Sequence, residues 1–297
     1  MAESFRYVLV TPARDEAAAI GQVIAAVRAQ VIAPVRWVIV DDASTDSTAD
    51  VVRQHTAGTD WIQLVRRSAD GAPADFASKV NAFQAGLRHL DGLDYDFIGN
   101  LDADVLVEPD YFAQVLQVFL DRPRLGIAGG HVIEEYGGRG VPQRISANSV
   151  SGAVQLFRRQ AFEDVGGLRP MRLGGEDSVA EILARMYGWE VATLFQLKVR
   201  HQGRVLSLNK GPLAAWFTRG VLNRSLGYAP MFQAAVSVYR AAVQAPYGLT
   251  GAAMFAGYVS AAARRVAPAL DADAVAFLRT EQRQRLRGML RLRRGDG

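Results

Sequence analysis

Residues 37–46 read WVIVDDASTD, an apolar run that ends in two aspartates. Its first four residues are β-branched or aromatic, which predicts a buried strand. A similar run, Tyr7–Val10, comes earlier, and Pro12 is expected to end that strand. Between the two runs, apolar residues of 20–27 recur at helical spacing. A strand, a helix and a strand in this order form a βαβ unit, so the sequence predicts a parallel sheet with right-handed crossovers.

The same alternation continues through the first two thirds of the chain. Helical spacing marks residues 80–90, 112–119 and 179–186, and strand-like runs occupy 62–65, 95–101, 126–132, 153–157 and 191–199. Pro109 suits the first turn of the second helix. After about residue 205 the strand signals stop, and small apolar residues and arginines dominate. We therefore predict an α/β fold with a Rossmann-like, mostly parallel sheet and flanking helices over residues 1–205, and a helical C-terminal region over residues 206–297.

The composition is that of a globular protein, with 49% hydrophobic and 22% charged residues among 297. There is no cysteine, which excludes disulfides and thiolate metal sites. The first six residues show no charged region followed by an apolar core, so we expect a cytoplasmic protein. Seven arginines and one glutamate fall between Arg279 and Arg294, although the net charge of the whole chain is only +4. The basic character therefore belongs to a tail, which argues against a nucleic-acid partner.

The C-terminal region raises the question of membrane contact. Residues 241–263 carry no charge and are long enough to cross a bilayer, but nine of these 23 residues are alanine and Pro246 interrupts them. We expect a helix that packs on the domain or lies at an interface. The tail arginines alternate with apolar residues, namely Leu278, Leu286, Met289, Leu290 and Leu292. This pattern predicts peripheral contact with a membrane surface, and a solvated, charged helix end is the alternative.

Acidic and polar clusters follow three of the predicted strands. They are Thr11–Glu16, Asp41–Ser44 and Asp102–Asp104. In open parallel sheets, ligands bind beyond the carboxyl ends of the strands, so three such clusters indicate a binding site. Taken singly, each cluster has a simpler explanation, because aspartate and serine also cap helices and form turns.

The Asp102-Ala103-Asp104 sequence suits a divalent cation. Residues i and i+2 lie on the same side of an extended chain, so both carboxylates can converge on one ion. Mg²⁺ or Mn²⁺ prefers such hard oxygen ligands and neutralises the diphosphate that leaves a sugar nucleotide. The spacing therefore predicts that Asp102 and Asp104 converge on one cation and its bound nucleotide, although an Asp-x-Asp sequence by itself is common.

Taken together and in order, these motifs resemble those of the family 2 inverting glycosyltransferases of the GT-A fold. Thr11–Glu16 resembles the Pro-x-Tyr-Asn-Glu opening of that family, and Val40–Asp46 matches its Val-Asp-Asp-x-Ser element. Lys79–Ala82 resembles its Lys-x-x-Ala-x-Asn region, with compressed spacing. Leu101–Asp104 matches its Asp-x-Asp element, and Gly174–Asp177 resembles its Glu-Asp element. The processive members carry a Gln-x-x-Arg-Trp element, of which residues 202–205 match only a fragment. The resemblance therefore implies a non-processive transferase of the bacterial polysaccharide or glycolipid type.

The resemblance also implies a role for individual residues. The nucleotide site comprises Thr11, Pro12, Ala13, Arg14, Glu16, Asp42, Lys79 and Asp102; the metal ligands are Asp104 and His201; the catalytic base is Asp177; and Glu176 and Gly152 lie on the acceptor side. Arg14 and Asp15 replace the usual tyrosine and asparagine, so a UDP-linked donor is expected but the base stays open.

Chemistry gives each of the last assignments a reason and an alternative. An inverting transfer needs one positioned carboxylate to deprotonate the acceptor hydroxyl, although Asp177 could also merely stabilise the start of a helix. Neutral imidazole is a good ligand for Mn²⁺, although a single histidine such as His201 is often structural.

Two other classes of protein stay open at this point. A sugar-1-phosphate nucleotidyltransferase should carry a glycine-rich loop after the first strand, which Thr11–Arg14 is not. A catalytically inactive nucleotide-sugar or membrane-binding module is the other class. For an active transferase, a hydroxyl acceptor linked to a polyisoprenoid would suit a protein docked at the inner face of the cytoplasmic membrane. The sugar, the acceptor and the oligomeric state are not predicted.

Overall fold

The structure is a computed structural model that describes residues 5–68, 76–136, 139–202 and 211–292. The chain divides into two compact units, Met1–Gly203 and Arg204–Gly297. Each unit is described separately below. The predicted boundary between residues 205 and 206 falls outside the described residues.

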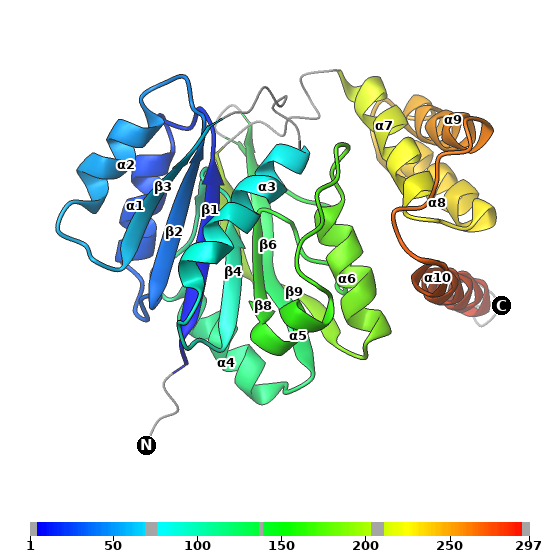
Figure 1. Ribbon diagram of the computed structural model, residues 1–297. Helices are drawn as coiled ribbons and strands as arrows, with labels where there is room; N and C mark the ends of the chain where they lie inside the picture. The colour runs from blue at the N-terminus through cyan, green and yellow to red at the C-terminus, as the bar shows by residue number, and fades with distance from the viewer. Residues whose placement is uncertain (1–4, 69–75, 137–138, 203–210, 293–297) are drawn as a thin grey trace. The chain divides into compact units, whose positions relative to one another are not determined.

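The first unit is built around one mixed sheet with flanking helices (Figure 1). Its strands run in the order β3-β2-β1-β4-β8-β6-β9-β5, and β7 pairs with β6. The strands are β1 (Tyr7–Ala13), β2 (Arg36–Asp42), β3 (Ile62–Arg67), β4 (Phe97–Leu101), β5 (Val105–Leu106), β6 (Leu125–Tyr136), β7 (Arg139–Pro142), β8 (Val154–Arg158) and β9 (Glu190–His201). The pairs β3–β2, β2–β1, β1–β4 and β6–β9 are parallel, and β8 joins the two groups in antiparallel orientation. The predicted α/β fold is confirmed.

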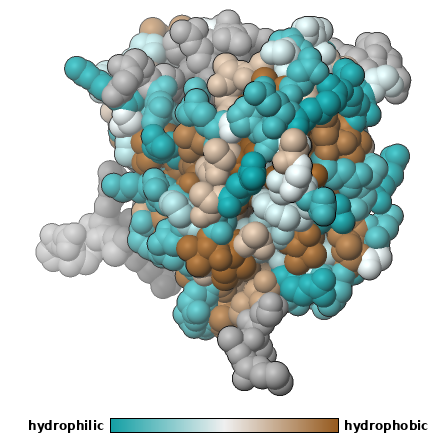
Figure 2. All heavy atoms as spheres, turned by 90° about the vertical axis from the view of Figure 1, so that its left-hand side faces the viewer, coloured by the Kyte–Doolittle hydropathy of each residue, from teal (hydrophilic) through white to brown (hydrophobic). Residues whose placement is uncertain are grey.

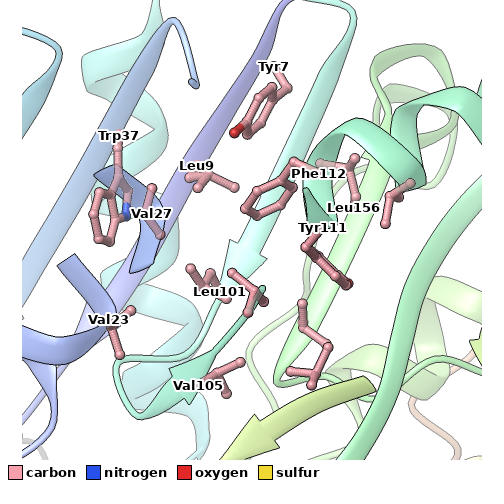
Figure 3. Packing of buried hydrophobic residues seen from close by; sticks show 14 of the residues in the cluster. Tyr7, Leu9, Val23, Val27, Trp37, Leu101, Val105, Tyr111, Phe112 and Leu156 are labelled. Carbon is pink, nitrogen blue, oxygen red and sulfur yellow. The ribbon is translucent and has the colours of Figure 1, made fainter. Parts of the chain in front are cut away.

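Helices cover both faces of this sheet. They are α1 (Ile20–Arg28), α2 (Thr48–Thr56), α3 (Phe76–Leu87), the 3-10 turn η1 (Arg88–Leu90), α4 (Tyr111–Asp121), α5 (Arg159–Asp164) and α6 (Glu176–Met186). On one face, Tyr7 and Leu9 of β1 pack toward Phe112 of α4, and the rings of Tyr7 and Phe112 stack with centroids 4.8 Å apart (Figure 3). On the other face α3 approaches so closely that a Cβ on Gly86 would lie 2.6 Å from Val10 Cγ1. On the side that carries α1 and α2, hydrophilic and apolar side chains alternate over the surface (Figure 2).

The structure corrects several local predictions. Strand β1 continues through Pro12 to Ala13, because pairing with β4 ends at Val10 and no ladder bond on that side needs the missing N–H of the proline. Helix α4 begins at Tyr111, so Pro109 precedes it. Strand β4 begins at Phe97 rather than Tyr95. Strands β5 and β7 and helices α2 and α5, all of them short, were not predicted from the sequence.

The second unit is helical within its described part. It contains α7 (Pro212–Ser225), α8 (Pro230–Val243), α9 (Leu249–Ala263) and α10 (Ala272–Leu292). Glycines let α9 pack tightly, since a Cβ on Gly257 would lie 2.0 Å from the carbonyl oxygen of Phe217 in α7, and one on Gly251 would lie 2.1 Å from that of Ser237 in α8. The uncharged stretch 241–263 is divided between the end of α8 and α9. Among the residues that the structure describes, no helix is both long and apolar enough to cross a membrane.

Candidate functional site

The strand ends bring the predicted clusters to one region of the first unit. The Thr11–Glu16 segment leaves the carboxyl end of β1, Asp42 ends β2, and Asp102 follows β4. The chain then turns, and the short strand β5 pairs with the end of β9 so that Val105 lies opposite His201. The backbone N–H of Gln202 also donates to the carbonyl oxygen of Asp104 at 2.9 Å. This pairing places Asp104 beside His201, although almost 100 residues separate them in the sequence.

His201 lies between two carboxylates. Its Nε2 is 3.2 Å from Asp104 Oδ2, and its Nδ1 is 2.8 Å from Glu134 Oε2. All three residues are buried. Burial alone would lower the pKa of His201, but hydrogen bonds to Asp104 and Glu134 raise it to about 10. The site is therefore one where a positive charge is strongly favoured.

The nearby Glu16 shares this negative environment. Its side chain is half-buried, and its backbone N–H donates to Thr48 Oγ1 at 2.8 Å. Burial, together with the charges of Asp104 and Asp102, raises the pKa of Glu16 to about 7. A cation bound here would reverse that effect, because an opposite charge favours the carboxylate form.

Asp102 has a different partner from Asp104. Lys79 Nζ of α3 lies 2.6 Å from Asp102 Oδ1 and 2.8 Å from Oδ2. Burial works against the charge of Lys79, but Asp102, Glu176 and Asp177 hold its pKa above its usual range. Asp102 thus pairs with a lysine, whereas Asp104 lies beside His201; their convergence on one cation and its bound nucleotide stays a prediction.

The donor set still fits a divalent cation. In the described part of the chain, no group of three or more acidic, histidine or cysteine side chains is arranged to hold a metal ion. Asp104 and His201, however, offer one carboxylate oxygen and one imidazole nitrogen 3.2 Å apart. Carboxylate and imidazole are both ligands of Mn²⁺, and a nucleotide diphosphate with water commonly completes such a shell.

Two predicted nucleotide-binding residues have partners within the protein. Thr11 is fully buried, and its hydroxyl accepts a hydrogen bond from Trp37 Nε1 at 2.9 Å. Asp42 is also buried, and its carboxylate accepts from Arg67 Nη1 at 2.5 Å and from the hydroxyl of Ser78. The side chain of Thr11 therefore belongs to the core, and a base contact by Asp42 would have to share its carboxylate with Arg67 and Ser78.

Pro12 and Ala13 end strand β1, and the loop that follows, with Arg14, is held in place by Asp15. Asp15 has a left-handed backbone with φ of 56°, and its Oδ1 accepts from the backbone N–H of Thr45 at 2.7 Å. In return, the backbone N–H of Asp15 donates to Ser44 Oγ at 3.0 Å. Asp15 thus ties the first acidic cluster to the second, while Arg14 is half-buried.

A pocket lies next to this region and contains the predicted base. It is lined by Lys79, Val80, Phe83, Asn100, Gly152, Gln155, Leu168, Glu176 and Asp177. Two buried acceptor atoms in it, Asn100 Oδ1 and Glu176 Oε2, have no hydrogen-bond partner. Burial, with the charge of Asp177, raises the pKa of Glu176 to about 7. Unpartnered buried acceptors are costly, so the pocket is suited to a ligand that donates hydrogen bonds.

Asp177 is positioned by helix α6 and by the loop before β8. It lies in the first turn of α6, and Gly152 packs against it so closely that a Cβ there would lie 3.1 Å from Asp177 Oδ2. One turn later on α6, the buried Glu181 accepts from the backbone N–H of Val150 at 2.6 Å and from Ser149 Oγ at 2.7 Å. Glu181 therefore clamps the 149–152 loop onto the helix that carries Asp177.

Sequence reasoning missed Glu134, Asn100 and Glu181. Glu181 had a signal, since it falls on the apolar face of α6 near Ile182 and Leu183. Glu134 is likewise a carboxylate in a strand of otherwise mostly apolar residues. Only the long-range pairing of Glu134 with His201 in the β6–β9 ladder brings it to the candidate site.

Known proteins share both the motifs and the fold. A model of glycosyl transferase family 2 matches residues 8–172. The O-antigen biosynthesis protein RfbC of Myxococcus xanthus is 29% identical over 173 residues, and the match covers 54% of this chain and 13% of that protein. The poly-beta-1,6-N-acetyl-D-glucosamine synthase of Staphylococcus aureus (strain COL) is 26% identical over 148 residues, and the match covers 43% of this chain and 34% of that protein. The chain thus spans about a third or less of the length of these curated relatives.

Two solved structures resemble the fold. The mannosyltransferase PcManGT of Pyrobaculum calidifontis, in complex with GDP-Man and Mn²⁺, is 19% identical with a TM-score of 0.56, covering 96% of this chain and 81% of that chain. TarS of S. aureus is 14% identical with a TM-score of 0.52, covering 86% of this chain and 43% of that chain. At such identities these likenesses concern the fold alone. The family model, in contrast, matches more than half of the sequence, and this protein therefore belongs to glycosyl transferase family 2.

Proposed function

We propose that the protein transfers a sugar from a nucleotide-diphosphate sugar to an acceptor hydroxyl, with inversion at the anomeric carbon. The observation that carries this proposal is the pocket in which Asp177, Glu176 and Lys79 meet. Lys79 pairs with Asp102, so the pocket adjoins the cluster of Asp102, Asp104 and His201. The site proposed for the charged diphosphate thus adjoins the site proposed for the sugar.

Asp177 is proposed as the general base. The acceptor oxygen attacks the anomeric carbon, and its proton passes to the Asp177 carboxylate as the new C–O bond forms. The bond between that carbon and the diphosphate oxygen breaks, and the bonding electrons leave with the nucleoside diphosphate. A carboxylate held at a helix start by Gly152 and by the clamped 149–152 loop can be pre-positioned for this step.

Asp104 and His201 would hold a divalent cation, Mg²⁺ or Mn²⁺. When bound, the metal neutralises the negative charge that develops on the leaving diphosphate. The likeness to a mannosyltransferase structure that contains Mn²⁺ supports this assignment. Glu134 orients His201 through Nδ1, which leaves Nε2 directed at Asp104.

The unpartnered acceptors suggest how a sugar is recognised. Asn100 Oδ1 and Glu176 Oε2 both need a hydrogen-bond donor. Sugar hydroxyls are such donors, and the lining by Phe83, Val80 and Leu168 supplies apolar walls. A UDP-linked donor is the first candidate because TarS, one of the fold neighbours, was solved with UDP-GlcNAc, and a GDP-linked donor is the second because PcManGT holds GDP-Man.

The proposed acceptor is a glycan hydroxyl, linked to a membrane lipid and reached at the inner face of the cytoplasmic membrane. The relatives' names, which refer to O-antigen and poly-N-acetylglucosamine biosynthesis, support a glycan acceptor. The helical unit, which is rich in arginine, supports contact with a membrane surface.

A thermal-shift panel of UDP and GDP, each with and without Mn²⁺, tests the donor and metal proposal. A ligand at a hundredfold excess over its Kd stabilises the folded state by about 2.7 kcal/mol, which raises Tm measurably. We expect one nucleotide to stabilise the protein only with Mn²⁺, and Asp104→Asn to lose that dependence. Asp110→Asn, at the exposed N-cap of α4, is the matched control and should respond like the wild type. No response of the wild type to either nucleotide would contradict the proposal.

A further inference from the structure

One side of α9 is exposed along its whole length and is entirely apolar. Its exposed residues at intervals of three and four form what is called here the α9 stripe, namely Leu249, Ala252, Ala256, Val259 and Ala263. The opposite side of the helix is buried through Gly251, Met254, Gly257, Tyr258 and Ala261. A helix that packs on a protein core normally exposes polar residues on its outer side, so an apolar outer side indicates a binding surface.

The neighbouring helix α8 repeats the pattern. Its exposed residues Met231, Ala235, Val238 and Ala242, here the α8 stripe, also recur at intervals of four and three. Met231 is 79% exposed and Val238 is 71% exposed. Tyr247, in the connection between the two helices, is 70% exposed. The second unit therefore presents large apolar side chains to solvent on two adjacent helices.

The charge around these stripes has one sign. Between residues 211 and 270 the sequence contains five arginines and no aspartate or glutamate. Arg264 and Arg265 are exposed directly after α9. Arg240, near the end of α8, lies over the rings of Trp216 and Tyr239, with its guanidinium carbon 5.3 and 5.8 Å from their centroids. Arginine beside aromatic rings and apolar residues is the composition of a surface that lies in a membrane interface.

We propose that the α8 and α9 stripes dock on the surface of an anionic lipid bilayer. The proposal deepens the membrane contact in the proposed function and rests on it for its biological purpose. Apolar side chains would enter the headgroup boundary while the surrounding arginines meet lipid phosphates. A second copy of the chain is a poorer occupant, because residues 211–270 carry arginines and no carboxylate, so two such surfaces would bring charges of the same sign together.

The basic helix α10 is not the inserting element in this proposal. Leu278, one of the apolar residues from which membrane contact of the tail was predicted, is buried together with Ala274 and Val275. The exposed residues of the described part of α10 include Ala276, Thr280 and Arg283. Helix α10 can thus add electrostatic attraction, while the apolar contact comes from α8 and α9.

Two variants with equal charge changes separate these surfaces. Ala252→Glu/Ala256→Glu places two carboxylates on the α9 stripe, and the matched control Ala276→Glu/Thr280→Glu places two on exposed positions of α10, at the same spacing. Each carboxylate brought to an anionic surface weakens binding by about fivefold, so the pair weakens it by about 25-fold. Val238→Ser/Val259→Ser, which changes no charge, tests the apolar contribution separately.

The assay is cosedimentation of the full chain with vesicles of equal parts phosphatidylcholine and phosphatidylglycerol. We expect the wild type to bind, both stripe variants to lose most binding, and the α10 variant to lose clearly less. The proposal would be overturned if the stripe variants bound like the wild type or if the wild type did not bind. It would also be overturned if the wild type were an oligomer and only the stripe variants were monomers, because the stripes would then be an interface between two copies of the chain. Donor hydrolysis is measured on the same samples without vesicles, and its rate should be the same for the wild type and all three variants. This control distinguishes a loss of docking from a loss of transferase activity.

Discussion

The contact between Glu134 and His201 gives the sharpest quantitative prediction. Glu134 Oε2 accepts a hydrogen bond from His201 Nδ1 at 2.8 Å, and both side chains are buried. This bond keeps a proton on Nδ1 when Nε2 gives up its own proton to bind a metal, and it raises the basicity of the ring. Glu134→Gln keeps an acceptor but removes the charge, and Glu134→Ala removes both.

The size of the effect follows from two independent considerations. A hydrogen bond to a charged group contributes about 1.5–3 kcal/mol, which is about 10- to 150-fold in affinity. Loss of the outer partner of a ligating histidine typically costs about 10- to 100-fold in metal affinity. We therefore expect Mn²⁺ affinity to fall by about tenfold in Glu134→Gln and by about 100-fold in Glu134→Ala.

The assay is calorimetric titration of Mn²⁺ into the protein together with a saturating nucleoside diphosphate. Glu135→Gln is the matched control, because Glu135 is exposed and faces Arg200 at 3.8 Å rather than His201. It should bind Mn²⁺ within about twofold of the wild type. Equal Mn²⁺ affinity in the wild type and in both Glu134 variants would refute the orienting role of Glu134, whereas a wild type that binds no Mn²⁺ would refute the metal site itself.

Two further predictions concern the elements around Asp177. A Cβ in Gly152→Ala would lie 3.1 Å from Asp177 Oδ2, so this variant should displace the proposed base. We expect steady-state kinetics to show kcat lowered by about tenfold at a nearly constant KM for the donor. An unchanged kcat would contradict the proposed role of Gly152. Burial, with the charge of Asp177, raises the pKa of Glu181 to about 8 from an ordinary value of 4.5. Between these two pH values the folded chain holds a proton that the unfolded chain releases, so the free energy of unfolding must fall as the pH rises. Glu181→Gln has no such proton, and its Tm should therefore fall less than that of the wild type between about pH 5 and about pH 8; parallel Tm curves would contradict this assignment.

The sheet was predictable where local pattern determined it. The apolar runs at residues 7–10 and 37–40 are buried on both faces, and the helix between them has the expected spacing. Strand β7 was not predictable, because all four of its residues are exposed and give no apolar signal. Strand β5 has only two residues, and its existence depends on pairing with β9 far along the chain.

The site shows the same limit. The predicted convergence of Asp102 and Asp104 assumed an extended chain, but the chain turns after Leu101. Asp102 consequently meets Lys79 of α3, and Asp104 meets His201 of β9. Short-range sequence pattern located the acidic residues, whereas their partners depend on tertiary packing.

The central claim, that Asp177 deprotonates the acceptor, is tested most directly by Asp177→Asn. We expect this variant to bind the nucleotide and Mn²⁺ like the wild type in the thermal-shift assay but to lose transfer by at least about a thousandfold. Asp273→Asn, the same change in the first turn of α10, should leave both unchanged. Transfer by Asp177→Asn at the wild-type rate would contradict the account.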